Sequence, residues 1–88
     1  MSATRILIAE DNDLVSLTLE EQLQGLGYDV VGIARSGTEA ISLAHRLAPD
    51  LIIMDIRMPE MEGTEAAAII RNQRPVPIIM LTAYADKE

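Results

Sequence analysis

Acidic and hydroxyl side chains follow directly after three short apolar runs of this sequence. Glu10 and Asp11 follow the first run, Asp55 follows another, and Thr82 follows the last one. If these runs are parallel strands of one open sheet, their carboxyl ends share one edge, and ligands bind outside that edge. Three carboxylates that meet there repel one another and raise one another's pKa unless a cation lies among them.

A hard divalent cation suits such a group. Magnesium takes oxygen ligands and commonly combines one or two carboxylates with waters and phosphate oxygens. The pattern therefore predicts a magnesium site prepared to receive a phosphoryl group, with the Thr82 hydroxyl across from Asp55 as a donor to a phosphoryl oxygen. Each residue alone has an ordinary interpretation as a helix-terminus acid, a turn former or a β-branched strand residue. Their coincidence at three strand ends favours the site.

The segments that must position these residues alternate between two patterns. Strands are predicted where apolar or β-branched residues run continuously, at residues 5–9, 28–34, 51–54 and 78–81. Helices are predicted from Asn12 or Asp13 to Gly27, from a Ser36–Glu39 capping box to Pro49, and over Glu65–Asn72. The order is βαβαβαβ, which builds a parallel α/β sheet through right-handed crossovers, with helices on both faces.

Apolar residues at helical spacing mark the side of each helix that is predicted to face the sheet. They are Val15, Leu19, Leu23 and Leu26 in the first helix, Ala40, Leu43, Ala44 and Leu47 in the second, and Ala66, Ile69 and Ile70 in the third. His45 falls on the polar side of its helix, and we expect it to be solvated surface.

Composition narrows the possible functions. The 88 residues carry 14 acidic and 7 basic side chains, and a net charge of −7 disfavours direct contact with nucleic acid or an anionic membrane. The 49% hydrophobic content argues for one folded domain, residues 1–88, and not for a disordered acidic tail. The chain has no cysteine, which excludes a thiolate metal site. Without a long apolar run or a signal peptide, we expect a cytoplasmic protein.

Three segments closely resemble the receiver domain of bacterial two-component response regulators. They are ILIAED at 6–11, DLIIMDIRMPEMEG at 50–63 and PIIMLTA at 77–83, and the match extends over residues 5–83. The resemblance implies a flavodoxin-like doubly wound sheet of strand order 2-1-3-4. It also implies that Asp55 accepts a phosphoryl group from a histidine kinase or phosphotransfer protein. Mg²⁺ would then be held by Glu10, Asp11, Asp55 and the main-chain carbonyl of Arg57.

The same resemblance assigns the remaining roles. Thr82 would be the switch hydroxyl that reads the phosphorylated state, and Ala83 the small neighbour that leaves room for the phosphoryl group. Pro59 and Gly63 would shape the loop after the phosphoacceptor. The signal would pass to an output domain or a downstream effector, and the Thr82-Ala-Tyr84 run is reminiscent of regulators with RNA-binding antiterminator outputs.

One part of the family's pattern has no counterpart in residues 1–88. The family continues with a fourth helix, a fifth strand that carries a lysine, and a fifth helix, roughly 30 residues together. Lys87 follows Thr82 too closely to be that lysine. The resemblance therefore predicts an incomplete receiver domain. We expect such a chain to accept a phosphoryl group poorly and to self-associate through the strand at 78–81, which is apolar on both faces.

Three other functions compete with a phosphorylation switch. An aspartyl phosphohydrolase would carry a second acid two residues after its nucleophile, where this chain has Arg57, so we do not expect an enzyme. A flavin or nucleotide binder would need a phosphate loop after the first strand, where residues 10–13 are mainly acidic. The third alternative is an interaction or dimerisation module that works without phosphorylation, and the missing lysine leaves it open.

Overall fold

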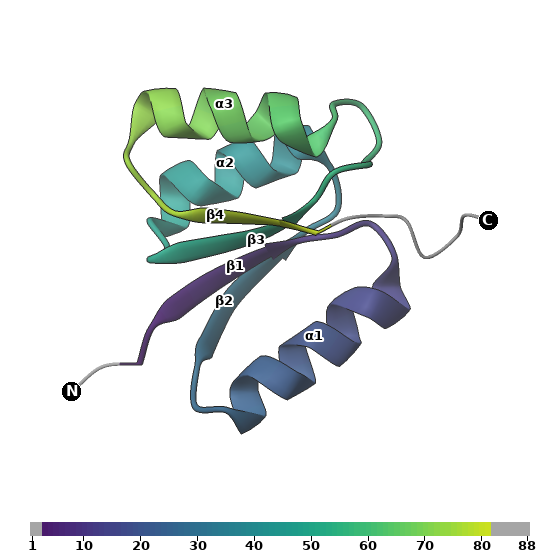
Figure 1. The fold of residues 1–88 in the computed structure, drawn as a ribbon, viewed down its shortest axis with the longest axis vertical. Coiled ribbons are helices and arrows are strands. Elements are labelled where there is room, and N and C mark those ends of the chain that lie inside the picture. Colours follow the sequence, from purple (N-terminus) through teal and green to yellow (C-terminus); the bar gives the residue numbers. More distant parts are fainter. Residues whose placement is uncertain (1–2, 82–88) are drawn as a thin grey trace.

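Four parallel strands form one sheet in the computed structural model, which describes residues 3–81 (Figure 1). The strands are β1 (Arg5–Ala9), β2 (Asp29–Ala34), β3 (Leu51–Asp55) and β4 (Ile78–Leu81), in the spatial order β2-β1-β3-β4. The helices are α1 (Asp13–Gly25), α2 (Gly37–Leu47) and α3 (Gly63–Gln73). α1 covers one face of the sheet, and α2 and α3 lie side by side on the other. The predicted element order, strand order and parallel sheet are confirmed.

Short-range hydrogen bonds define where the first two helices begin. The Asn12 side chain caps α1 by accepting from two amides of its first turn, at 3.0 and 3.1 Å. At α2, the Ser36 hydroxyl accepts from the Glu39 amide at 3.0 Å, and the Glu39 carboxylate accepts from the Arg35 amide at 2.7 Å. The capping box is therefore present, although its carboxylate binds the amide before the N-cap. Gly27 has a φ of 96° just after α1, a conformation that glycine adopts without strain.

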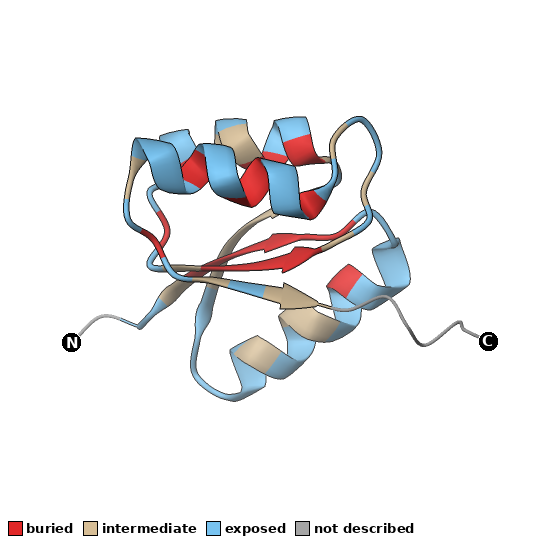
Figure 2. Cartoon of the chain, turned by 45° about the horizontal axis from the view of Figure 1, so that its top comes forward, coloured by how far each residue is buried: buried red, intermediate tan, exposed pale blue. Residues whose placement is uncertain are grey.

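Apolar side chains fill the space on both faces of the sheet. Figure 2 shows the buried residues concentrated on the central strands and on the inner sides of α2 and α3. The larger buried cluster, between the sheet and these two helices, contains Leu7, Ala9, Ala34, Ala40, Ala44, Ile52, Met54, Ala66, Ala67, Ile70 and Val76. The smaller cluster, under α1, contains Ile6, Ile8 and Ile53. Because burial of each large aliphatic side chain contributes roughly 1.5–3 kcal/mol, β1 and β3 are the most firmly held strands.

Two of the predicted helix faces are partly wrong. On α1, Leu19 and Leu23 pack against the smaller cluster, but Val15 and Leu26 are 40% and 74% exposed. The helix crosses only β1 and β2, so its two ends extend past the apolar surface. On α3, Ala67 takes the inner position expected for Ile69, because the small alanines allow α3 to approach the sheet closely. No helix among residues 3–81 has the length and apolar character needed to cross a membrane.

The edge strand β4 is only partly covered, as the sequence predicts. Ile78 and Met80 pack against the larger cluster, whereas Ile79 points to the α1 side and is 52% exposed. In the described part of the chain, α1 does not reach β4, and β4 pairs only with β3. On the α1 face of the sheet, Leu81 packs against the smaller cluster, so the part of β4 that is open to solvent is at Ile79.

Candidate metal centre

Three carboxylates meet where the two central strands end. Asp55 is the last residue of β3, and Glu10 and Asp11 follow β1 directly. Since β1 and β3 are parallel neighbours, with Ala9 opposite Met54, both chains leave the sheet at the same edge. One carboxylate oxygen from each acid lies within 4.8 Å of the other two. The sequence-based expectation that these three side chains converge is confirmed.

The three acids differ in how far they are shielded from water. Glu10 is 5% exposed and Asp55 is 9% exposed, whereas Asp11 is exposed. Two hydrogen bonds hold Glu10: its amide donates to the Ala34 carbonyl at 2.9 Å, and its side-chain carboxylate accepts from the Asn12 amide at 3.0 Å. The cluster therefore has a fixed, buried side and a solvent-facing side through which a ligand can enter.

The electrostatics of the cluster are unfavourable without a cation. Burial raises the pKa of the Glu10 carboxyl above its ordinary value of 4.5, and the negative charges of Asp55 and Asp11 raise it further. The hydrogen bond from the Asn12 amide acts in the opposite direction and lowers this pKa. Within residues 3–81, the ion pair that forms joins Arg35 to Asp13, and no basic side chain pairs with the cluster. Three oxygen donors with no compensating charge are a set that fits Mg²⁺.

The loop between β3 and α3 begins at the cluster and is tightly folded. The Gly63 amide donates to the Ile56 carbonyl at 2.6 Å, and a methyl group on Gly63 would clash with the Asp55 carbonyl oxygen. This position accepts only glycine, which agrees with the predicted role of Gly63 in shaping the loop. Arg57 is exposed within the loop, and its carbonyl stays a predicted ligand.

A strained turn lies in the same loop. The Met61 amide donates to the Pro59 carbonyl at 2.7 Å, which closes a γ-turn around Glu60, whose φ is 70°. A γ-turn with positive φ at its centre is rare and strained for a residue other than glycine. Pro59 thus stands at a turn, as predicted.

The described part of β4 ends beside the cluster. Leu81 is paired with Asp55, and its carbonyl accepts from the Ile56 amide at 3.3 Å. Thr82 and Ala83, the predicted switch hydroxyl and its small neighbour, lie outside the described residues, so their roles stay predictions.

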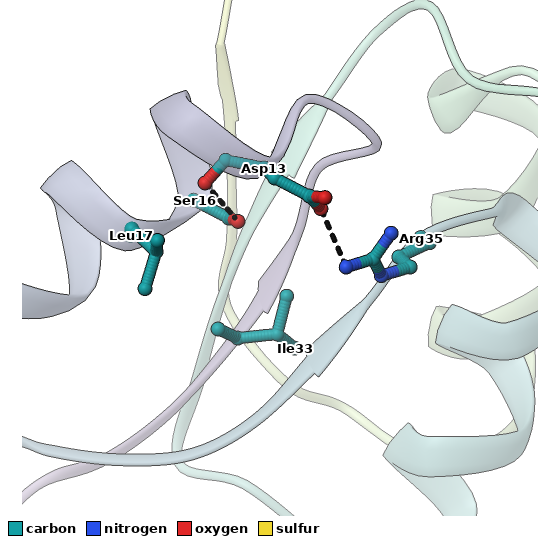
Figure 3. Close-up of a pocket in the computed structure, with 5 residues that line it drawn as sticks. All are labelled: Asp13, Ser16, Leu17, Ile33 and Arg35. Carbon is teal, nitrogen blue, oxygen red and sulfur yellow. Dashed lines mark hydrogen bonds and ion pairs between the residues drawn. The ribbon is translucent and has the colours of Figure 1, made fainter.

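A pocket at the start of α1 was not predicted from the sequence. It has a volume of about 270 Å³ and lies between α1 and β2, lined by Asp13, Ser16, Leu17, Ile33 and Arg35 (Figure 3). The ion pair between Arg35 and Asp13, at 2.5 Å, closes one end of the pocket. The paired residues come from segments far apart in the sequence, and no local pattern indicates that they meet.

The structure thus contains an open parallel α/β sheet of order 2-1-3-4 with three carboxylates at its carboxyl edge. The chain belongs to the response regulator receiver domain family, whose family model matches residues 6–88. It is therefore a receiver domain of a two-component response regulator, as the sequence resemblance implied.

Individual relatives extend this comparison. The transcriptional regulatory protein PdtaR of Mycobacterium tuberculosis is 45% identical over 84 residues, which are 96% of this chain and 41% of PdtaR. The solution NMR structure of the Erythrobacter litoralis PhyR response regulator REC domain has a TM-score of 0.87 and 34% identity, and the match covers 100% of this chain and 74% of that one. The chain thus spans less than half the length of PdtaR.

A further structure contains a partner protein. It is the co-crystal structure of the anti-anti-sigma factor PhyR complexed with the anti-sigma factor NepR, from Bartonella quintana. Its TM-score is 0.85 with 35% identity, and the match covers 97% of this chain and 36% of that one.

Proposed function

We propose that this receiver domain is a phosphorylation-dependent switch in which Asp55 accepts a phosphoryl group from a histidine kinase or phosphotransfer protein. The observation that carries the proposal is the meeting of three carboxylates at the end of the central strands, two of them nearly buried and without a basic partner in the described residues. Such a group is costly to maintain unless it binds a cation and a reacting group.

The chemistry follows from the position of Asp55. One of its carboxylate oxygens attacks the phosphorus of a phosphohistidine, the phosphorus–nitrogen bond breaks, and the electron pair returns to the imidazole. The product is an acyl phosphate on Asp55. Glu10 and Asp11, with Asp55 and the Arg57 carbonyl, would hold Mg²⁺, which when bound neutralises charge on the transferring group. The Thr82 hydroxyl would donate to a phosphoryl oxygen, and Ala83 would leave the room for it.

The donor protein would approach over the first turns of α1. Leu14 and Leu17 are 74% and 54% exposed there, only a few residues after the acidic pair. Apolar side chains on an acidic surface favour a partner that covers them while it reaches Asp55. In the whole protein, the signal would pass from this domain to an output domain or an effector, and we propose that this takes place in the cytoplasm.

Intact mass measurement tests the proposal. Acetyl phosphate and Mg²⁺ should add one phosphoryl group to the full-length protein, and Asp55→Asn should abolish the addition. Asp50→Asn is the matched control, because it removes a carboxylate that flanks the same strand at its opposite end. Phosphorylation of the Asp55→Asn protein at Asp50 or Asp13 would show that the phosphoacceptor is assigned wrongly.

We do not assign a hydrolytic activity. An aspartyl phosphohydrolase would need a general acid–base near position 57, where this chain has an arginine, a residue type that does not serve in that role. If the full-length protein released inorganic phosphate from a phosphorylated substrate at a rate far above the decay of its own acyl phosphate, the absence of a hydrolytic activity would be contradicted.

Self-association is the second candidate function, and the exposure of Ile79 supports it. We propose that residues 1–88, prepared by themselves, associate through β4, whose outer edge has no partner among the described residues and whose Ile79 is 52% exposed. Light scattering after size exclusion should give a dimer or larger species for residues 1–88, and Ile79→Lys should give a monomer. If residues 1–88 without this substitution form a sharply melting monomer at tens of micromolar concentration, the proposal is refuted.

A further inference from the structure

The turn between β2 and α2 contacts both segments that carry the carboxylate cluster, although it contributes no residue to the cluster. On one side, the Ala34 carbonyl accepts the amide of Glu10 at 2.9 Å. On the other side, Gly37 lies in direct contact with the backbone of Met61 in the β3–α3 loop. Residues 34–37, from the last residue of β2 to the first residue of α2, therefore bridge the chain after β1 and the chain after β3.

The contact between Gly37 and Met61 leaves no room for a side chain. A methyl group on Gly37 would lie 2.5 Å from the Met61 carbonyl oxygen and 2.8 Å from the Met61 Cβ, so either the loop or the helix would have to shift. Among the described glycines, only Gly27 has a positive φ. Space, and not backbone conformation, is therefore what requires glycine at position 37.

The loop that receives this contact is fixed at few points. Gly63 holds its end through the hydrogen bond to Ile56, and the γ-turn around Glu60 holds Met61 to Pro59. The contact with Gly37 supports Met61 from outside the loop. Arg57, whose carbonyl is the predicted fourth ligand, lies between these points, so a shift at Met61 is transmitted toward it.

We infer that Gly37 is a positioning residue for the metal centre: by abutting Met61, it sets the path of the β3–α3 loop relative to the acids after β1. The inference rests on the proposed function, since it concerns the Mg²⁺ site proposed above. Gly37 touches neither the metal ligands nor the reacting atoms. It acts only through the loop that starts at Asp55.

Alanine substitutions at three glycines separate positioning from general stability. Gly37→Ala forces the loop or α2 to move, whereas Gly32→Ala adds the same methyl against the flexible end of the Leu47 side chain, at 2.9 Å, and Gly25→Ala meets nothing within 4 Å. For each protein, the amide NMR shifts are recorded first without metal. They are then followed while Mg²⁺ is added. Thermal melts by far-UV circular dichroism monitor the fold.

Gly37→Ala should change the NMR shifts of the amides of residues 56–62 in the metal-free protein. It should also raise the Mg²⁺ dissociation constant about ten-fold, which is the usual effect of changing a residue that orients a metal ligand. Gly32→Ala and Gly25→Ala should bind Mg²⁺ like the parent, whatever their melting temperatures. If Gly37→Ala binds Mg²⁺ like the parent, or if Gly32→Ala weakens Mg²⁺ binding equally, the positioning role of Gly37 is overturned. The proposed function is not affected by either result.

Two further outcomes are informative. If Gly37→Ala does not fold, Met61→Gly removes the Met61 Cβ from the contact and frees the backbone of the loop at this point, so Mg²⁺ binding should weaken. Parent-like Mg²⁺ binding by that variant overturns the inference. If the parent protein itself binds no Mg²⁺, the proposed function fails, and the centre that Gly37 would position fails with it.

Discussion

Replacement of Glu10 by glutamine should stabilise the metal-free protein. Glutamine keeps an oxygen that can accept the Asn12 amide, now at 3.0 Å from the Glu10 carboxylate, but it carries no charge. The substitution therefore removes the repulsion between Glu10 and the carboxylates of Asp11 and Asp55 without removing the local hydrogen bond. It also removes the cost of keeping a charge at a position that is 5% exposed.

The distances in the cluster give the magnitude. Two unit charges 4.8 Å apart, the upper limit for this cluster, repel by roughly 1 kcal/mol in water and by roughly 3 kcal/mol at an effective dielectric constant of about 20. The repulsion between Glu10 and Asp11 is near the first value, because Asp11 is exposed. The repulsion between Glu10 and Asp55 is nearer the second value, because Asp55 is buried. After screening by salt, we expect a net gain of roughly 1–3 kcal/mol at pH 7, which is about 5–15 °C in melting temperature for a domain of this size.

The gain should depend on pH in one direction. The pKa of Glu10 is raised in the folded protein, so folding disfavours its ionised form. The parent therefore loses stability as pH rises from the unfolded-state pKa through the folded-state pKa, and the glutamine variant does not. The difference between the two proteins should be largest at neutral pH, should shrink as pH falls through the folded-state pKa, and should be gone below the unfolded-state pKa, at about pH 4.

Far-UV circular dichroism during urea and thermal unfolding is the suitable assay, because the chain has no tryptophan and only 2 tyrosines. Glu21→Gln is the matched control, since it removes one negative charge from the exposed side of α1. Saturating Mg²⁺ should stabilise the parent more than Glu10→Gln and so reduce the difference. A Glu10→Gln protein that melts at or below the parent temperature at pH 7 without metal would refute the repulsion argument.

Three further predictions concern the site and the core. Asp11→Asn should weaken Mg²⁺ binding about ten-fold in an amide-shift titration, and unchanged binding would remove Asp11 from the site. Mg²⁺ affinity of the parent should fall as pH is lowered toward the raised pKa of Glu10, because the metal needs the ionised carboxylate; calorimetry in buffers of different ionisation enthalpy should detect proton release on binding. Ile70→Ala should cost about 2–5 kcal/mol in urea unfolding, since this side chain is fully buried under α3, whereas Ile69→Ala should cost much less.

The sequence alone predicts the order and most of the boundaries of the elements, because these depend on neighbouring residues. The cap at Asn12, the hydrogen bond from Glu39 to Ser36 and the left-handed Gly27 all involve residues at most four positions apart or a single backbone angle. The convergence of Glu10, Asp11 and Asp55 also follows from the sequence, since parallel strands must end at a common edge.

Tertiary structure decided what depends on how distant segments are set against one another. The sequence pattern does not distinguish Ile69 from Ala67 as the inner residue of α3, because both lie near the edge of its apolar side. Likewise, no local signal predicts the ion pair between Asp13 and Arg35 or the contact between Gly37 and Met61. The angle of a helix, the path of a loop and the close approach of two backbones are fixed only when the whole sheet and its helices pack together. The reason is that close packing depends on the side chains of all the elements at once.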